Sequence, residues 1–136
     1  MIWLLLILFE LKHFICDYPL QTEIMLKKGS AKSTEWIPAL LVHCLVHSMG
    51  AMLVCIVFIF ICSSVTGVAP TKDKANVMFY IAFVDFILHF VIDRIKAHPK
   101  IGGRWKSNQK AFWNALGLDQ AAHHLCQFGY IYLLTR

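Results

Sequence analysis

Charged residues are scarce in this chain of 136 residues: Asp, Glu, Lys and Arg make up 15% of the sequence, against about 25% in soluble domains. Apolar residues reach 58%, compared with about 45–50% in soluble domains, and the mean hydropathy is +0.60. This composition excludes an ordinary soluble domain and favours an integral membrane protein. The length suits one domain, residues 1–136, with about four spans of ~20 residues each.

The sequence also lacks a CxxC pair, and its five cysteines all lie in apolar stretches. We therefore expect buried thiols and no disulfide framework. The first apolar run, residues 1–9, has no basic residue before it and no small-residue cleavage site after it, so we expect a mature helix and no signal peptide.

Four apolar segments predict an all-α integral membrane bundle of four transmembrane helices. Pro19 closes the first segment, because proline disfavours helical backbone in the residue before it, and Pro99 follows the third. The predicted spans are about residues 2–18, 37–63, 75–96 and 111–134.

Basic residues are distributed unevenly between the two sides of such a bundle. Nine lie in or beside the first and third loops, whereas Lys72, Lys74 and Arg136 lie on the side of the termini. The positive-inside rule then places both termini outside. Because these residues lie in short loops between apolar runs, we expect lipid headgroups as their partners and no nucleic acid. The nine are Lys27, Lys28, Lys32, Arg94, Lys96, Lys100, Arg104, Lys106 and Lys110.

Ionisable residues inside the predicted spans recur at a spacing of four. Residues four apart share one face of a helix, so each span presents a polar stripe. Charged groups at mid-membrane cost at least ~2.5–3.5 kcal/mol each, which favours stripes that face one another. The pairs are His13 and Asp17, His43 and His47, and Asp119 and His123, with Asp85, His89 and Asp93 forming two successive steps.

The depth of these stripes is also shared. At a rise of ~1.5 Å per residue, His13, His43, His89 and Asp119 all lie roughly 8–12 Å from the cytosolic helix ends. Four antiparallel helices therefore bring every pair to one level.

Imidazole and carboxylate together are a ligand set for Zn²⁺, Mn²⁺ or Fe²⁺, so we expect one or two divalent metal ions in this layer. The alternative is hydrogen bonding between helices without metal, as polar membrane residues often make. Asp17 and Asp85 are candidate general bases, and they and His13 are also candidates for orienting the other ligands. The candidate metal ligands are His13, His43, His47, His89, Asp93, Asp119 and His123.

Lys96, Arg104 and Lys106 lie just cytosolic of the layer. They are candidates for an anion-binding rim; ordinary positive-inside charge is the alternative. Lys96 follows Asp93 by three residues and is expected to face the site.

The motifs together resemble a family of small bacterial and phage polytopic membrane proteins of unknown function. They are His13-x-x-x-Asp17-x-Pro-Leu-Gln21, the His43 pair, His89-x-x-x-Asp93-x-x-Lys96 and Asp119-Gln120-x-x-His123. The resemblance spans nearly the whole chain. It implies a protein of the bacterial inner membrane and supplies no activity.

Three functions fit these features. The first is a membrane-embedded, metal-dependent hydrolase of a lipid-linked or other phosphate-containing substrate, although no GxSxG nucleophile motif is present. The second is a non-catalytic interaction protein, for instance a phage factor acting on a host membrane protein. The third is a metal-ion or proton transporter. The outer half of the predicted bundle offers almost no polar residues, so a transport path would need the axis of a homo-oligomer.

Overall fold

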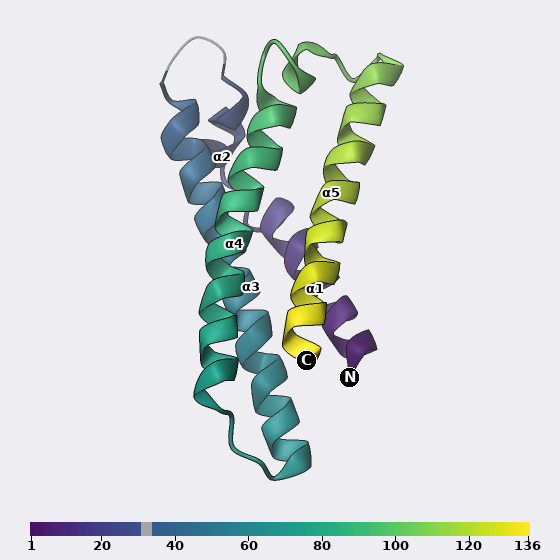
Figure 1. The fold of residues 1–136 in the computed structure, drawn as a ribbon. Helices are drawn as coiled ribbons and strands as arrows, with labels where there is room; N and C mark the ends of the chain where they lie inside the picture. The colour runs from purple at the N-terminus through teal and green to yellow at the C-terminus, as the bar shows by residue number, and fades with distance from the viewer. Residues whose placement is uncertain (31–33) are drawn as a thin grey trace.

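The computed structural model describes residues 1–30 and 34–136, which form helices and no β-strand. The prediction of an all-helical protein is confirmed. Lys32, one of the nine basic residues above, lies outside the described residues. The long helices are α1 (Ile2–Asp17), α3 (Trp36–Thr66), α4 (Lys72–Ala97) and α5 (Lys110–Thr135); the short ones are α2 (Glu23–Leu26), η1 (Lys27–Gly29) and η2 (Gly102–Arg104) (Figure 1).

Local sequence signals set the helix ends. Gly67 ends α3 in the left-handed conformation, at φ 69°, which glycine adopts without a Cβ clash. Thr71 caps α4 through its side chain, which accepts a hydrogen bond from the backbone N–H of Lys74. Helix α4 stops at Ala97, and His98, extended before Pro99, follows it.

The four long helices form a closed ring of neighbours. Helix α3 packs against α1 and α4, and α5 packs against α4 and α1. Both chain termini lie toward the end of the bundle that carries the turn between α3 and α4, whereas the connection between α4 and α5 lies at the opposite end (Figure 1). The chain therefore runs back and forth along the bundle, and residues early in one helix meet residues late in the next.

An apolar layer fills the bundle interior on the side of the termini. Leu5 and Phe9 of α1 are fully buried there, with Cys55 of α3 and Ile81 of α4. Along α1 and α4, the apolar layer comes first in the sequence and most of the buried residues after it are polar. Along α3 and α5, the polar buried residues precede the apolar layer. The interior is thus divided into an apolar layer and a polar layer. The remaining members of the apolar layer are Ala51, Val54, Phe58, Tyr130, Ile131 and Leu134.

Two helical segments are long and apolar enough to cross a membrane. They are Trp36–Thr66, which contains an 18-residue stretch with a mean hydropathy of 2.5, and Lys72–Arg104, which contains one with a mean hydropathy of 2.0. Large apolar side chains also cover the outside of the other two long helices, for example Trp3 on α1 and Leu118 on α5, which are 78% and 73% exposed. Apolar surface of this extent marks a face that contacts lipid or a partner, and these features indicate membrane association.

Candidate metal centre

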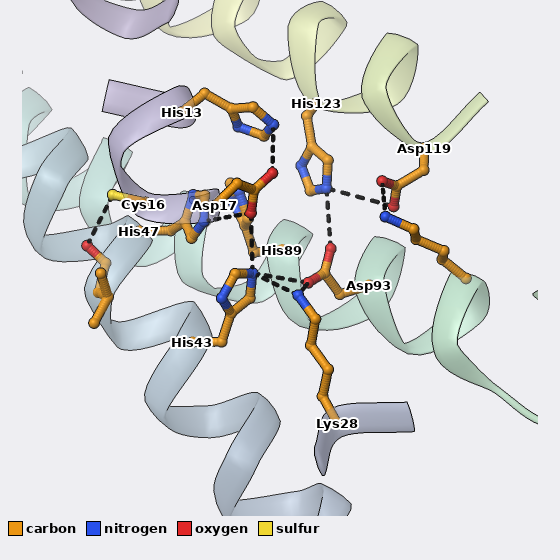
Figure 2. A network of polar contacts seen from close by, with 12 residues as sticks. His13, Cys16, Asp17, Lys28, His43, His47, His89, Asp93, Asp119 and His123 are labelled. Carbon is orange, nitrogen blue, oxygen red and sulfur yellow. Dashed lines mark hydrogen bonds and ion pairs between the residues drawn. The ribbon is translucent and has the colours of Figure 1, made fainter. Parts of the chain in front are cut away.

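The polar layer consists of His and Asp side chains from all four long helices. His13 and Asp17 come from α1, and the other helices contribute one pair each (Figure 2). All of these side chains are buried except that of Asp17, which is 19% exposed. The structure thus brings together the pairs whose spacing predicted a shared layer: His43 with His47, His89 with Asp93, and Asp119 with His123.

One group of possible ligands is Asp17, His43 and His47, whose nearest ligand atoms all lie within 4.8 Å of one another. Oδ1 of Asp17 lies 3.2 Å from Nε2 of His47 and 3.5 Å from Nε2 of His43. The other oxygen of Asp17 lies 3.2 Å from Nε2 of His13. A single carboxylate therefore faces three imidazoles from two helices.

A second group is Asp93, Asp119 and His123, which meets the same distance limit. Oδ1 of Asp93 lies 3.1 Å from Nε2 of His123, and Oδ2 of Asp93 lies 3.0 Å from Nε2 of His43. The two oxygens of Asp93 thus point to the two different groups. Asp93 could therefore contribute one oxygen to each of the two groups of possible ligands.

His89 presents a nitrogen that is suited to metal binding. Its Nδ1 lies 3.1 Å from the backbone carbonyl oxygen of Asp85, and a carbonyl only accepts hydrogen bonds, so Nδ1 carries the proton. In the neutral ring Nε2 then keeps its lone pair, and this buried atom has no hydrogen-bond partner among the described residues. His89, His13 and His123 form a third group of possible ligands. A second interaction that fixes the tautomer is typical of metal-ligating histidines.

Lysines neutralise three of the four buried or half-buried carboxylates. Nζ of Lys28, from η1, donates to Oδ2 of Asp93 at 2.8 Å and lies 2.9 Å from Nε2 of His43. Nζ of Lys96 donates to Oδ2 of Asp119 at 2.8 Å. Asp17 has no lysine partner among residues 1–30 and 34–136 and faces imidazoles alone. Asp17 is only 19% exposed, and a carboxylate largely withdrawn from water is costly without a cation, so this side of the cluster suits an added positive charge.

Asp85 belongs to a separate ion pair at the flank of the cluster. Nζ of Lys12 lies 2.9 Å from Oδ2 of Asp85, and Oδ1 of Asp85 lies 3.3 Å from Nδ1 of His89. The stem of Lys12 runs along Gly50 of α3, where an added Cβ would come within 3.0 Å of Cγ of Lys12. The absence of a side chain at Gly50 allows α1 and α3 to approach closely enough to bury this lysine.

Sequence reasoning did not assign Lys12 and Lys28 to the site. The signal for Lys12 was its position as a cation inside an apolar span, which calls for a buried anion nearby. Lys28 carried no such signal, because it lies within the connection between α1 and α3, whose path no periodicity describes.

The candidate rim residues have different surroundings. Lys96 and Arg104 line a cavity of about 460 Å³ that also reaches Asp119. The guanidinium of Arg104 lies 4.1 Å above the ring of Trp105. Lys106 is exposed in the turn before α5, where its backbone N–H donates to the side chain of Gln109. Lys96 faces the site, as its spacing from Asp93 predicted.

Fold and site together define an all-helical protein with membrane-type surfaces and buried His/Asp clusters that could hold a metal ion. The chain belongs to the family described as "Protein of unknown function (DUF3307)", which matches residues 4–134. An uncharacterised family covering nearly the whole chain is what the resemblance implied. No match to the chain is found among curated proteins or among solved structures.

Proposed function

We propose that this protein spans the bacterial inner membrane four times, with both termini outside, and binds one or two divalent metal ions in its polar layer. We further propose that it uses them to hydrolyse a phosphate-containing amphipathic substrate near the cytosolic face. The observation that carries this proposal is the convergence of His and Asp side chains from four helices into groups of ligand spacing.

The surface of the bundle supports four spans. Helices α3 and α4 have the length and hydropathy of membrane helices, and α5 carries exposed leucines such as Leu125. Helix α1 has 16 residues, which at ~1.5 Å per residue reach about 24 Å. This falls a little short of the ~30 Å hydrocarbon core, and the exposed aromatic rings of Trp3 and Tyr18 suit the interfaces at its two ends.

The arrangement of Asp93 supports two metal positions. One oxygen faces His123 and the group that includes Asp119, and the other faces His43 and the group that includes Asp17. The mixed N/O donor set fits Zn²⁺, Mn²⁺ or Fe²⁺ better than Ca²⁺ or Mg²⁺, which prefer oxygen ligands. In this proposal Asp17 is a ligand, because both of its oxygens face imidazoles.

The chemistry of such a site supports hydrolysis. A divalent cation held there would lower the pKa of bound water to about 7 and so supply hydroxide at neutral pH. Lys28 and Lys96 lie within hydrogen-bond distance of the ligand carboxylates, where their ammonium groups can also bind phosphate oxygens.

The apolar layer favours a reaction at one face of the membrane and disfavours transport through the bundle. Leu5, Phe9, Ile81 and their neighbours are buried directly beyond the polar layer on the side of the termini. Ions crossing the bundle interior would have to pass this dry layer.

The test is metal analysis of the detergent-purified protein, combined with a hydrolysis assay. We expect the wild type to hold one or two equivalents of Zn, Mn or Fe, and His123→Ala to lose most of them. His124→Ala is the matched control, because His124 is the next residue along α5 but pairs with Glu10 at the surface. Phosphate release from dioleoylphosphatidic acid should follow metal content in the three proteins.

Two results would contradict the proposal. If the wild type takes up no metal after incubation with Zn²⁺, Mn²⁺ and Fe²⁺, the metal site is refuted. If it holds stoichiometric metal and releases no phosphate from lipid phosphoesters, the hydrolase is refuted, and a non-catalytic interaction protein becomes the better explanation.

A further inference from the structure

A cavity between α4 and α5 adjoins the metal centre and differs from it in character. Its volume is about 460 Å³, within the range of small-molecule sites. Asp119, which belongs to the ligand group Asp93, Asp119 and His123, is one of its lining residues. The cavity therefore shares a wall with the cluster.

The walls of this cavity are apolar along the helices. Ile92 and Ile95 contribute from α4, and Leu118 and Ala122 contribute from α5. Ile95 and Leu118 are 52% and 73% exposed, so the cavity opens sideways between the two helices. In a membrane this opening faces the acyl chains.

The cytosolic end of the cavity is cationic. Lys96, Lys100 and Arg104 line it, and Lys96 is already paired with Asp119. Lys100 and Arg104 are exposed and form no ion pair with any described residue. Two uncompensated cations thus lie beside an apolar slot, at one end of a buried acidic cluster.

We propose that this cavity binds a lipid that ends in a phosphate monoester, and that this lipid is the substrate of the metal centre. This inference rests on the proposed function and names its substrate class. A phosphate monoester carries a charge of about −1.5 to −2 at pH 7, which matches Lys100 and Arg104. The hydrocarbon lies against Ile92, Ile95 and Leu118 and leaves through the lateral opening into the bilayer.

Hydrolysis of such a lipid consumes one water molecule. The water oxygen forms a bond to phosphorus, and the bond between phosphorus and the lipid oxygen breaks. A proton from water ends on the lipid oxygen, so the products are a lipid alcohol and inorganic phosphate.

The shape of the cavity depends on close packing of the loop that contains η2. A Cβ on Gly102 would collide with the carbonyl oxygen of Lys96, and one on Gly103 would collide with that of Ala97. The loop is therefore held against the end of α4. This contact places Arg104 over the cavity.

The test is direct binding of dioleoylphosphatidic acid to the purified protein in detergent, measured by native mass spectrometry. Leu118→Trp fills the cavity, and Leu125→Trp is its matched control, an exposed leucine seven residues along α5 that does not line the cavity. Lys100→Gln/Arg104→Gln removes the two cations, and Lys27→Gln/Lys72→Gln removes the same charge elsewhere. We expect at least tenfold weaker binding for Leu118→Trp and for Lys100→Gln/Arg104→Gln. Binding by the two control variants should change by no more than twofold.

Three outcomes would overturn the inference. Equal weakening by both tryptophan variants would place the lipid elsewhere. Equal binding of dioleoylphosphatidylcholine would show an unselective annulus of lipid, and displacement of the lipid by millimolar inorganic phosphate would show a site for the free anion.

Metal content measured on the same samples separates this inference from the proposed function. Full metal content with no preference for phosphatidic acid would refute the lipid site alone. Absence of metal with selective lipid binding would refute the metal centre and leave the lipid site standing.

Discussion

The buried ion pair between Lys12 and Asp85 allows a quantitative test of the charge balance in the cluster. Nζ and Oδ2 are 2.9 Å apart, and the two side chains are 3% and 1% exposed. Removing one partner of such a pair costs about 3–5 kcal/mol, because the other charge remains buried without compensation. In Lys12→Met the apolar stem along Gly50 is retained and only the ammonium is lost. We therefore expect Lys12→Met to lower the free energy of unfolding by about 3–5 kcal/mol.

The assay is a double-mutant cycle in mixed micelles, with unfolding driven by sodium dodecyl sulfate and followed by tryptophan fluorescence. Asp85→Leu should also destabilise the protein, because it leaves the ammonium of Lys12 buried. Lys12→Met/Asp85→Leu should recover to within about 1 kcal/mol of the wild type, since apolar replacement of a whole buried pair is often neutral or better. Lys27→Met, at an exposed lysine, is the control. If the two single effects simply add in the double variant, the residues are not coupled and the reasoning is refuted.

Three further predictions concern the metal centre and the loop beside it. Lys28→Met should tighten Zn²⁺ binding about tenfold, or about 1.4 kcal/mol, because the ammonium occupies the atoms of Asp93 and His43 that would bind metal; weaker binding in a competition titration would contradict this. Asp93→Asn should abolish the binding of a second equivalent of metal in elemental analysis, whereas Asp73→Asn, in the exposed first turn of the same helix, should leave it unchanged. Gly102→Ala should cost about 1–3 kcal/mol of stability through overpacking against Lys96. Gly117→Ala, where a Cβ meets open space, should not destabilise the protein. Equal effects of the two substitutions in the same unfolding assay would show that the loop is not tightly packed.

The helices and the polar layer could be predicted because both follow from short-range rules. Hydropathy and Pro19 delimit the first helix, and a spacing of four residues places His13 and Asp17 on one face. Antiparallel connections then bring His43 and His89 to the same depth. In the structure the rings of His47 and His89 have centroids only 4.0 Å apart, which shows how closely the stripes of α3 and α4 meet.

The part that could not be predicted depends on how the helices rotate and on how the first connection folds. Lys12 precedes His13 by one residue and so points about 100° away around α1; which helix it meets depends on packing. The first connection, between α1 and α3, contains α2, whose Met25 is buried and whose end leads directly into η1. That short turn carries Lys28 into the cluster, and it is too brief for periodicity to reveal.

The distribution of charge within the cluster connects these observations to function. Replacing buried ion pairs by apolar residues is often neutral or stabilising, so packing alone does not explain the polar layer. The apolar layer that includes Phe9 is an interior of the apolar kind in the same bundle. In the polar layer three carboxylates have lysine partners, whereas Asp17 faces only imidazoles and His89 presents a nitrogen without a partner among the described residues. Asp17 and His89 belong to two different groups of possible ligands, and a cation bound in each group would satisfy the two features. The layer lies toward the basic loops and shares Asp119 with an apolar, cation-rimmed cavity. The same asymmetry therefore supports both the proposed metal centre and the proposed anionic, amphipathic substrate.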